Sequence, residues 1–358
     1  MKKALPVFLF FYSILLTTSV NGQKYSNEFL SIGLGARAQA MGNAVVASQE
    51  DVMSIYWNPA SLVHTQAEGL QIGALHNEWF AGIGKYDYLG FSIPLKNREA
   101  RLGFGLIRFG IDGIPNTLSL YEDDGSINYN SIVEFSAADY AIYSSYSQKT
   151  NLLDGQLSWG LNAKIVRRVI GSFANSWGFG LDLGARWTKN QWRAGLLLRD
   201  ISTTVNAWSV NFTEEEKDIL LVSGNSLPDI NSTEITKPSI LLGFGRYLNL
   251  NQFSIYPEIN LFVTTDGQRN TLVSSDPVSM DIGFGLECIY KGVVFLRTGI
   301  HQFQYVQDFD LSEKLSVKPS AGVGFKISGF SVDYAFTTLG SGNDQPSHVF
   351  SLMYNLNK

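Results

Sequence analysis

Charged residues, cysteine and long apolar runs are all scarce in this chain of 358 residues. Charged residues make up 16% of the sequence, whereas a typical soluble protein carries about 25%. Because the hydrophobic share of 45% is ordinary, uncharged polar residues, glycine and aromatics replace the missing charge. Such a mixture suits a protein whose outer face meets lipid. The net charge of −5, with no basic stripe, argues against a nucleic-acid partner.

Cysteine and histidine are too few to build most catalytic or metal centres. Cys288 is the only cysteine, which excludes an intramolecular disulfide and a zinc site made of several thiolates. The histidines, His64, His76, His301 and His348, lack the spacing of metal ligands. No GxSxG motif occurs, and no cysteine–histidine nucleophile pair can be assembled. We therefore expect a protein without metal or cofactor, and not an enzyme.

Residues 1–22 have the form of a secretory signal peptide. Lys2 and Lys3 precede an apolar run over residues 4–16, and a small, polar stretch ends at Gly22. The run of about 13 residues is too short for a membrane-spanning helix, which needs about 20. No later stretch of the sequence is long and apolar enough for one either. We expect cleavage after Gly22, export from the cytoplasm and no transmembrane helix.

The strongest structural signal is a two-residue alternation of apolar and polar side chains, clearest over residues 175–188. The aromatic residues lie at both ends of the apolar row, as in a strand that meets both headgroup regions of a membrane. The polar row is rich in glycine with single charges, as a crowded barrel interior would be. A soluble sandwich shows the same alternation, but the strand length and the export signal favour a barrel. The side chains expected to point outward are Trp177, Phe179, Leu181, Trp187, Phe284 and Phe336.

The pattern repeats along the chain and predicts an all-β fold, a transmembrane antiparallel β-barrel of about fourteen strands. An even number is expected of a bacterial single-chain barrel. The predicted strands cover residues 69–77, 85–95, 100–109, 132–147, 156–169, 175–188, 191–201, 238–247, 252–264, 279–291, 293–301, 317–327, 330–338 and 347–356.

Short and long connections alternate, so we expect the short turns to face the periplasm and the long loops to face outside. Among the long loops are residues 110–131, 202–237 and 302–316. Within the longest, Thr213 followed by Glu216 has the pattern of a capping box, which predicts a short surface helix.

The segment behind the signal peptide does not alternate and carries a different pattern. It contains Gly35-Ala36-Arg37-Ala38, Met41-Gly42-Asn43-Ala44, Asp51 and Trp57-Asn58-Pro59-Ala60. In order, spacing and position this series resembles the start of the PorV/PorQ family, a branch of the FadL-like outer-membrane barrels. The resemblance covers about residues 29–62, whereas the later strand pattern is generic.

The resemblance implies that residues 23–66 form a hatch inside the barrel of residues 67–358. Asn58, Pro59 and Ala60 would form a turn of this hatch. Arg37 and Asp51 would lie buried in the lumen as partners, or would only satisfy polar groups of the barrel interior. The hatch motif then comprises Arg37, Gly42, Asn43, Asp51, Trp57, Asn58, Pro59 and Ala60.

Two functions follow from the resemblance. A PorV/PorQ-type barrel would bind exported proteins for type IX secretion and cell-surface delivery, whereas a FadL-like barrel would carry hydrophobic small molecules. Both would be integral to the outer membrane, in contact with its lipid. An apolar tunnel would favour transport, and a closed, polar lumen beneath an outer platform would favour protein binding. The loop residues expected to bind secreted or secretion-system proteins are Phe212, Ile219, Leu220, Phe303, Tyr305 and Phe309.

Overall fold

The computed structural model describes residues 25–356 apart from 80–81, 96–98, 123, 151–153, 223, 225–230, 308–311 and 339–345. The predicted signal peptide therefore lies outside the described residues. None of the helices in the described part is long and apolar enough to cross a membrane.

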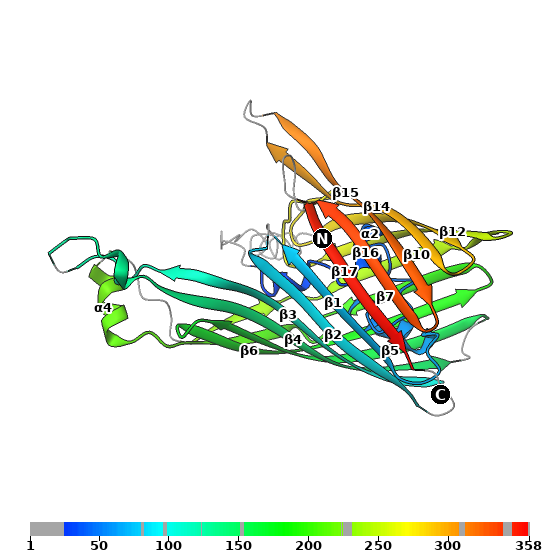
Figure 1. The fold of residues 1–358 in the computed structure, drawn as a ribbon, viewed down its shortest axis with the longest axis horizontal. Coiled ribbons are helices and arrows are strands. Elements are labelled where there is room, and N and C mark those ends of the chain that lie inside the picture. The colour runs from blue at the N-terminus through cyan, green and yellow to red at the C-terminus, as the bar shows by residue number, and fades with distance from the viewer. Residues whose placement is uncertain are drawn as a thin grey trace, which may run out of the picture.

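Antiparallel strands form one sheet that closes on itself into a barrel (Figure 1). Closure is direct, because Gln71 of the first strand pairs with Ser92 on one side and with Asn355 near the end of the chain on the other. The strands are β1 Gln71–Trp79, β2 Gly84–Leu95, β3 Ala100–Asn116, β4 Val133–Thr150, β5 Gln156–Ile170, β6 Ala174–Lys189, β7 Trp192–Arg199, β8 Thr204–Val210, β9 Asn231–Thr236, β10 Ser239–Arg246, β11 Leu248–Leu250, β12 Phe253–Thr264, β13 Ser279–Tyr290, β14 Val294–Gln307, β15 Glu313–Ile327, β16 Phe330–Thr338 and β17 Pro346–Asn355.

These strands occupy fourteen positions around the barrel. Both β7 and β8 pair with β6, so they lie end to end along one position. Next to them, β9 pairs with β8 and β10 pairs with β7, so these two strands share the following position. The short β11 continues β10 along β12. The predicted barrel of fourteen strands is therefore confirmed.

Alternate side chains of each strand point out of the barrel or into its lumen. Trp177, Phe179, Phe284 and Phe336 are 40–58% exposed, as expected of outward positions. An exposed apolar band of this kind is typical of barrels that face lipid. The intervening residues are mostly glycine, serine, asparagine and single charged residues, and they are buried, as Asp182 is. This alternation follows from the pleat of a strand, whose successive side chains point to opposite faces.

Short helices before β1 lie inside the ring of strands and contact strands of the barrel wall (Figure 1). Almost all their side chains are buried. The helices are η1 Glu28–Leu30, α2 Ala36–Ala40, α3 Ser54–Trp57 and η2 Pro59–His64.

Several strands continue beyond the barrel at the end with the long connections, which corrects the predicted loops. Residues 110–131 and 302–316 were expected to be loops, but β3 runs to Asn116, β14 to Gln307 and β15 begins at Glu313. Both pairings shift register where these extensions leave the barrel, which interrupts the two-residue alternation along β3 and β14. Cross-strand pairing continues beyond the shift in both cases.

The longest predicted loop, residues 202–237, likewise holds two strands, β8 and β9, with helix α4 (Glu214–Val222) between them. The predicted capping box is confirmed: the Thr213 amide donates to Glu216 Oε2 at 2.8 Å, and the Glu216 amide donates to Thr213 Oγ1 at 3.2 Å. Helix α4 and the ends of β3 to β6, β8 and β9 form an outer platform that reaches far from the barrel, at the left of Figure 1.

Candidate functional site

The N-terminal segment, residues 25–67, is hydrogen-bonded to widely separated parts of the barrel wall. The Ala36 amide donates to Ser351 Oγ on β17 at 2.8 Å. On β5, Asn162 Nδ2 donates to the Ile55 carbonyl at 2.7 Å. The segment therefore joins inner faces that lie far apart around the ring.

The Asn58-Pro59-Ala60 turn is built around the Asn58 side chain. Its Oδ1 accepts from the Ala60 amide at 3.1 Å, and its Nδ2 donates to the carbonyls of Val46 and Ala185, both at 3.1 Å. Pro59 opens helix η2, where a missing N–H is harmless. One asparagine thus ties together the turn, a second stretch of the segment and strand β6.

Glycines allow the segment to approach the wall closely. Gly42 has φ +59°, and a Cβ atom there would lie 2.7 Å from the Ile300 backbone. On the wall, a Cβ atom at Gly299 would lie 2.2 Å from the Gly42 nitrogen. Asn43 shares the left-handed conformation of Gly42, which asparagine tolerates better than most residues. The glycine-rich inner faces therefore leave room for backbone rather than for side chains.

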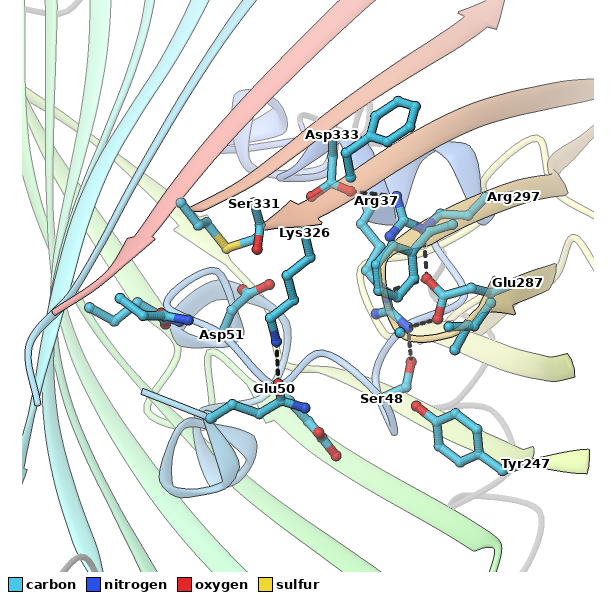
Figure 2. Close-up of a pocket in the computed structure, with 18 of the residues that line it drawn as sticks. Arg37, Ser48, Glu50, Asp51, Tyr247, Glu287, Arg297, Lys326, Ser331 and Asp333 are labelled. Atoms are coloured by element: carbon cyan, nitrogen blue, oxygen red, sulfur yellow. Dashed lines mark hydrogen bonds and ion pairs between the residues drawn. The ribbon is translucent and has the colours of Figure 1, made fainter. Parts of the chain in front are cut away.

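A charged inner cavity of about 510 Å³ lies between the segment and the wall, near the short turns (Figure 2). Arg37 of α2 binds both carboxylate oxygens of Glu287, at 3.0 and 3.1 Å. Arg297 donates to the same carboxylate and to Asp333, both at 2.6 Å. This chain of four charges connects the N-terminal segment to β13, β14 and β16. Bidentate arginine–carboxylate pairs hold geometry well.

Arg37 and Asp51 do not bind each other directly. Gln49 stands between the two, accepting from Arg37 at 3.2 Å and donating to Asp51 at 2.7 Å. The other Asp51 oxygen accepts from the Met53 amide at 2.8 Å. Burial raises the pKa of the Asp51 carboxyl above its ordinary value. Arg37 pairs with Glu287 instead, because that carboxylate projects into the lumen beside it.

Charges of both signs line the inner cavity in equal number. An apolar molecule would displace water from these groups without replacing its hydrogen bonds, so the inner cavity is poorly suited to hold one. The cationic residues are Arg37, Arg193, Arg297 and Lys326, and the acidic residues are Glu50, Asp51, Glu287 and Asp333.

An outer cavity of about 420 Å³ lies at the opposite end of the segment, towards the long connections. Its apolar lining includes Leu30, Tyr56 and Trp57 of the segment, and Leu241 and Phe262 of the wall. The Tyr56 hydroxyl donates to the Leu30 carbonyl, which holds the aromatic ring in place. Polar and charged side chains, such as Asn27, Asp200 and Arg269, complete the lining. A concave surface that combines apolar area with convergent polar groups is typical of small-molecule sites.

The first described residues form one edge of this outer cavity. Arg269 binds Glu28 at 2.8 Å, and its guanidinium lies 4.2 Å from the Tyr25 ring centre. Asn27 Nδ2 donates to Thr236 Oγ1 on β9 at 2.9 Å. Polar contacts therefore fasten the start of the segment to the rim of the barrel.

A third hollow, the outer groove of about 740 Å³, lies on the outer platform. Two predicted partner-binding residues, Phe212 and Leu220, line it, and Phe212 packs on Phe173 with ring centres 5.6 Å apart. Ile219 is half-buried on α4. Further lining residues are Phe135, Ile170, Trp208 and Val210.

The other predicted partner-binding residues do not join this groove. Phe303 and Tyr305 lie on β14, and Tyr305 is exposed. Phe309 lies outside the described residues. The structure therefore brings together only part of the predicted set.

The alternation in the sequence indicated the charged residues of the lumen, because single charges stand on a glycine-rich face. It did not indicate which of these charges pair with each other. Lys164, for example, is fully buried between Asp182 at 3.0 Å and Asp200 at 2.6 Å. Lys164 lies on β5, Asp182 lies on β6 and Asp200 follows β7, so the three charges meet only when the sheet is folded.

Comparisons with known proteins identify the fold. No family model and no curated protein matches the chain. Among solved structures, it is similar to the Ralstonia pickettii toluene transporter TbuX, with TM-score 0.54 and 13% identity over 91% of this chain and 99% of that one. The P. putida toluene transporter TodX has TM-score 0.54 and 12% identity, over 91% of this chain and 99% of its own. The CymD monoaromatic hydrocarbon channel has TM-score 0.54 and 13% identity, over 94% of this chain and 100% of its own.

These likenesses show a common fold, a closed antiparallel β-barrel. Membership of the PorV/PorQ family stays a prediction, because it rests on the motif of residues 29–62 alone.

Proposed function

We propose that this protein is an integral outer-membrane barrel that admits small hydrophobic molecules, with the N-terminal segment as its hatch. The observation that carries the proposal is the outer cavity, whose apolar lining is formed jointly by the segment and the wall. Its lining from Leu30, Tyr56 and Trp57 makes the segment part of the site. The role is that of a channel and requires no enzymatic step.

A solute in the outer cavity would meet the segment before the periplasmic side. Beyond the segment lies the inner cavity, whose charges disfavour an apolar molecule. Passage therefore requires the segment to shift, because its buried side chains fill the space between the two cavities. Such a shift would have to break polar contacts, such as Arg37 with Glu287, and to separate buried apolar residues of the segment, such as Leu34 and Val46, from the barrel.

The hatch can be tested by locking the segment to the wall. The changes Ala36→Cys and Ser351→Cys, in a Cys288→Ser background, place two thiols where the Ala36 amide now contacts Ser351 Oγ at 2.8 Å. Uptake of toluene, a solute of the kind that TbuX and TodX are described as carrying, is measured in proteoliposomes. We expect oxidation to reduce uptake at least tenfold, and reduction of the disulfide to restore it.

The single variant Ala36→Cys, treated with the same oxidant, is the control. Undiminished uptake by the locked barrel would show that the segment is not a hatch. Absence of uptake by the folded wild-type barrel, for toluene and larger hydrophobic solutes alike, would show that transport is the wrong function.

A second candidate function is the binding of exported proteins, as in PorV/PorQ-type secretion. The outer platform favours it, since its groove exposes aromatic and aliphatic side chains beyond the barrel. Aromatic anchors surrounded by polar residues are common at protein interfaces. The charged inner cavity also agrees better with a lumen that stays closed.

A further inference from the structure

The outer cavity contains buried polar atoms that lack a hydrogen-bond partner. Among the described residues, these include Asn27 Oδ1, Asn43 Oδ1 and His301 Nδ1, all on residues that line the cavity. The three side chains are 5%, 7% and 9% exposed. Burying a polar atom without a partner destabilises a protein, so such atoms in a cavity wall mark places where a ligand can supply the missing bond.

His301 lies beside further polar side chains, whereas Asn27 contacts Thr236 on β9 and the Asn43 carbonyl accepts from Asn260 on β12. Gln302 and Gln304 follow His301 along β14, and the register of β14 against β15 shifts between His301 and Gln304. Gln302 has φ +51°, so the strand is bent here. Such irregularities redirect side chains and are frequent beside functional sites. We group these residues with Asn27 and Asn43 as the polar side of the cavity, and Leu241 and Phe262 belong to its apolar side.

The charges of this cavity argue against an anionic ligand. Its acidic residues outnumber its basic ones, and most charges already have partners, as Arg269 does with Glu28 and Asp266. A carboxylate would thus enter a region of excess negative charge, where Arg269 is already paired and Arg199 donates to the Tyr56 carbonyl at 3.2 Å. The acidic residues are Glu28, Asp200, Asp266 and Asp281, and the basic residues are Arg199, Lys237 and Arg269.

We infer that the outer cavity takes a neutral amphiphile, an aromatic or aliphatic body that carries one hydroxyl group, in preference to a bare hydrocarbon or a carboxylate. The apolar side receives the body. The hydroxyl donates to one of the free acceptors, Asn27 Oδ1, Asn43 Oδ1 or His301 Nδ1. This inference rests on the proposed function and names the solute class of the same site.

Three probes of matched shape test the inference: 4-propylphenol, propylbenzene and 4-propylbenzoate. Binding to the full barrel in nanodiscs is measured by equilibrium dialysis. We expect the phenol to bind about tenfold more tightly than the other two, the gain of about one well-formed hydrogen bond.

Two variants test whether the polar side of the cavity causes the preference for the phenol. Asn43→Gly removes one acceptor and suits the left-handed backbone at that position, where φ is +59°. His301→Phe removes another acceptor and keeps a planar ring. We expect each to reduce the preference for the phenol at least threefold. On the apolar side, Leu241→Ala should weaken phenol and hydrocarbon equally.

The outcomes separate the inference from the proposed function. Equal or tighter binding of propylbenzene would overturn the inference and leave a hydrocarbon channel in place. Tightest binding of 4-propylbenzoate would overturn it in favour of an anion site. A folded barrel that binds none of the probes would refute both the inference and the proposed function. A phenol preference unchanged in both polar-side variants would place the site elsewhere.

Discussion

At the scale of single residues, the lumen tolerates charge because buried charges meet opposite ones or hydrogen-bonding groups, as Arg101 does with the carbonyls of Ala67 and Gly69. Lys164 is the clearest case, fully buried between two aspartates. A buried ion without a partner costs several kcal/mol, so such groups are stable only as sets. The network from Arg37 through Glu287 to Arg297 follows the same rule and also attaches the segment to the wall.

The outward positions permit a prediction about depth in the membrane. Leu183 lies mid-strand on β6, paired with Leu161 and Leu198, whereas Trp187 lies near the short turn. Leu183→Arg is expected to lower the free energy of unfolding by about 2–4 kcal/mol, and Trp187→Arg by about 0–1 kcal/mol, because the cost of charge falls towards the interface. Denaturant titration of the barrel in lipid vesicles measures both.

Leu181, which also points outward on β6, should behave as Leu183 does. Equal, negligible effects at all three positions would contradict the assignment of this face to lipid.

At the scale of elements, strands obey two different rules. Within the barrel, successive side chains of a strand face lipid and lumen in turn, so the sequence pattern predicts where the strand lies. The end of β3, on the outer platform, does not keep this alternation, whereas β8 begins with it, since Thr204 and Asn206 are buried and Val205 is exposed. Helix α4 forms there through its local cap and has no buried residue.

Deletion of residues 211–222 tests whether the platform binds proteins. Barrel assembly should survive, because α4 is exposed and lies outside the ring of strands. Co-purification of secreted or secretion-system proteins from native outer membranes should be lost if the platform is a docking surface.

A matched pair of point variants refines this test. Phe212→Ala removes a ring from the outer groove and should weaken the association, whereas Glu215→Ala on the exposed side of α4 should not. Retention of every protein partner after the deletion would contradict the protein-binding candidate.

At the scale of the whole molecule, the N-terminal segment and the barrel form one packed unit. Residues far apart in sequence meet directly, as Gln71 and Asn355 do across the closure at 2.7 Å. The core of the molecule is therefore the contact between the segment and the inner wall, not a layer between two sheets.

This arrangement predicts resistance to proteolysis. Trypsin added to the side of the short turns should not cleave at Arg37, whose side chain is only 12% exposed and bound to Glu287. Mass spectrometry of the products measures cleavage, and the same protein unfolded in denaturant should be cut there. Rapid cleavage at Arg37 of the folded barrel would show that the segment spends time outside the lumen.

The sequence by itself determined the elements whose signals are local. Alternation located the barrel strands to within a few residues, because a strand pleat repeats every two residues whatever its neighbours are. The capping box of Thr213 and Glu216 predicted α4 for the same reason: the bonds join residues three apart. The unusual segment around Asn58 was also visible as a break in the alternation.

Only the tertiary structure decided what these elements build together. Glu287 and Asp333 were visible as single charges, but their meeting with Arg37 and Arg297 depends on which strands become neighbours when the sheet closes. The outer cavity likewise combines Trp57 with Phe262 and His301, from three distant parts of the chain. Contacts of this kind are set by closure and register, which no local pattern encodes.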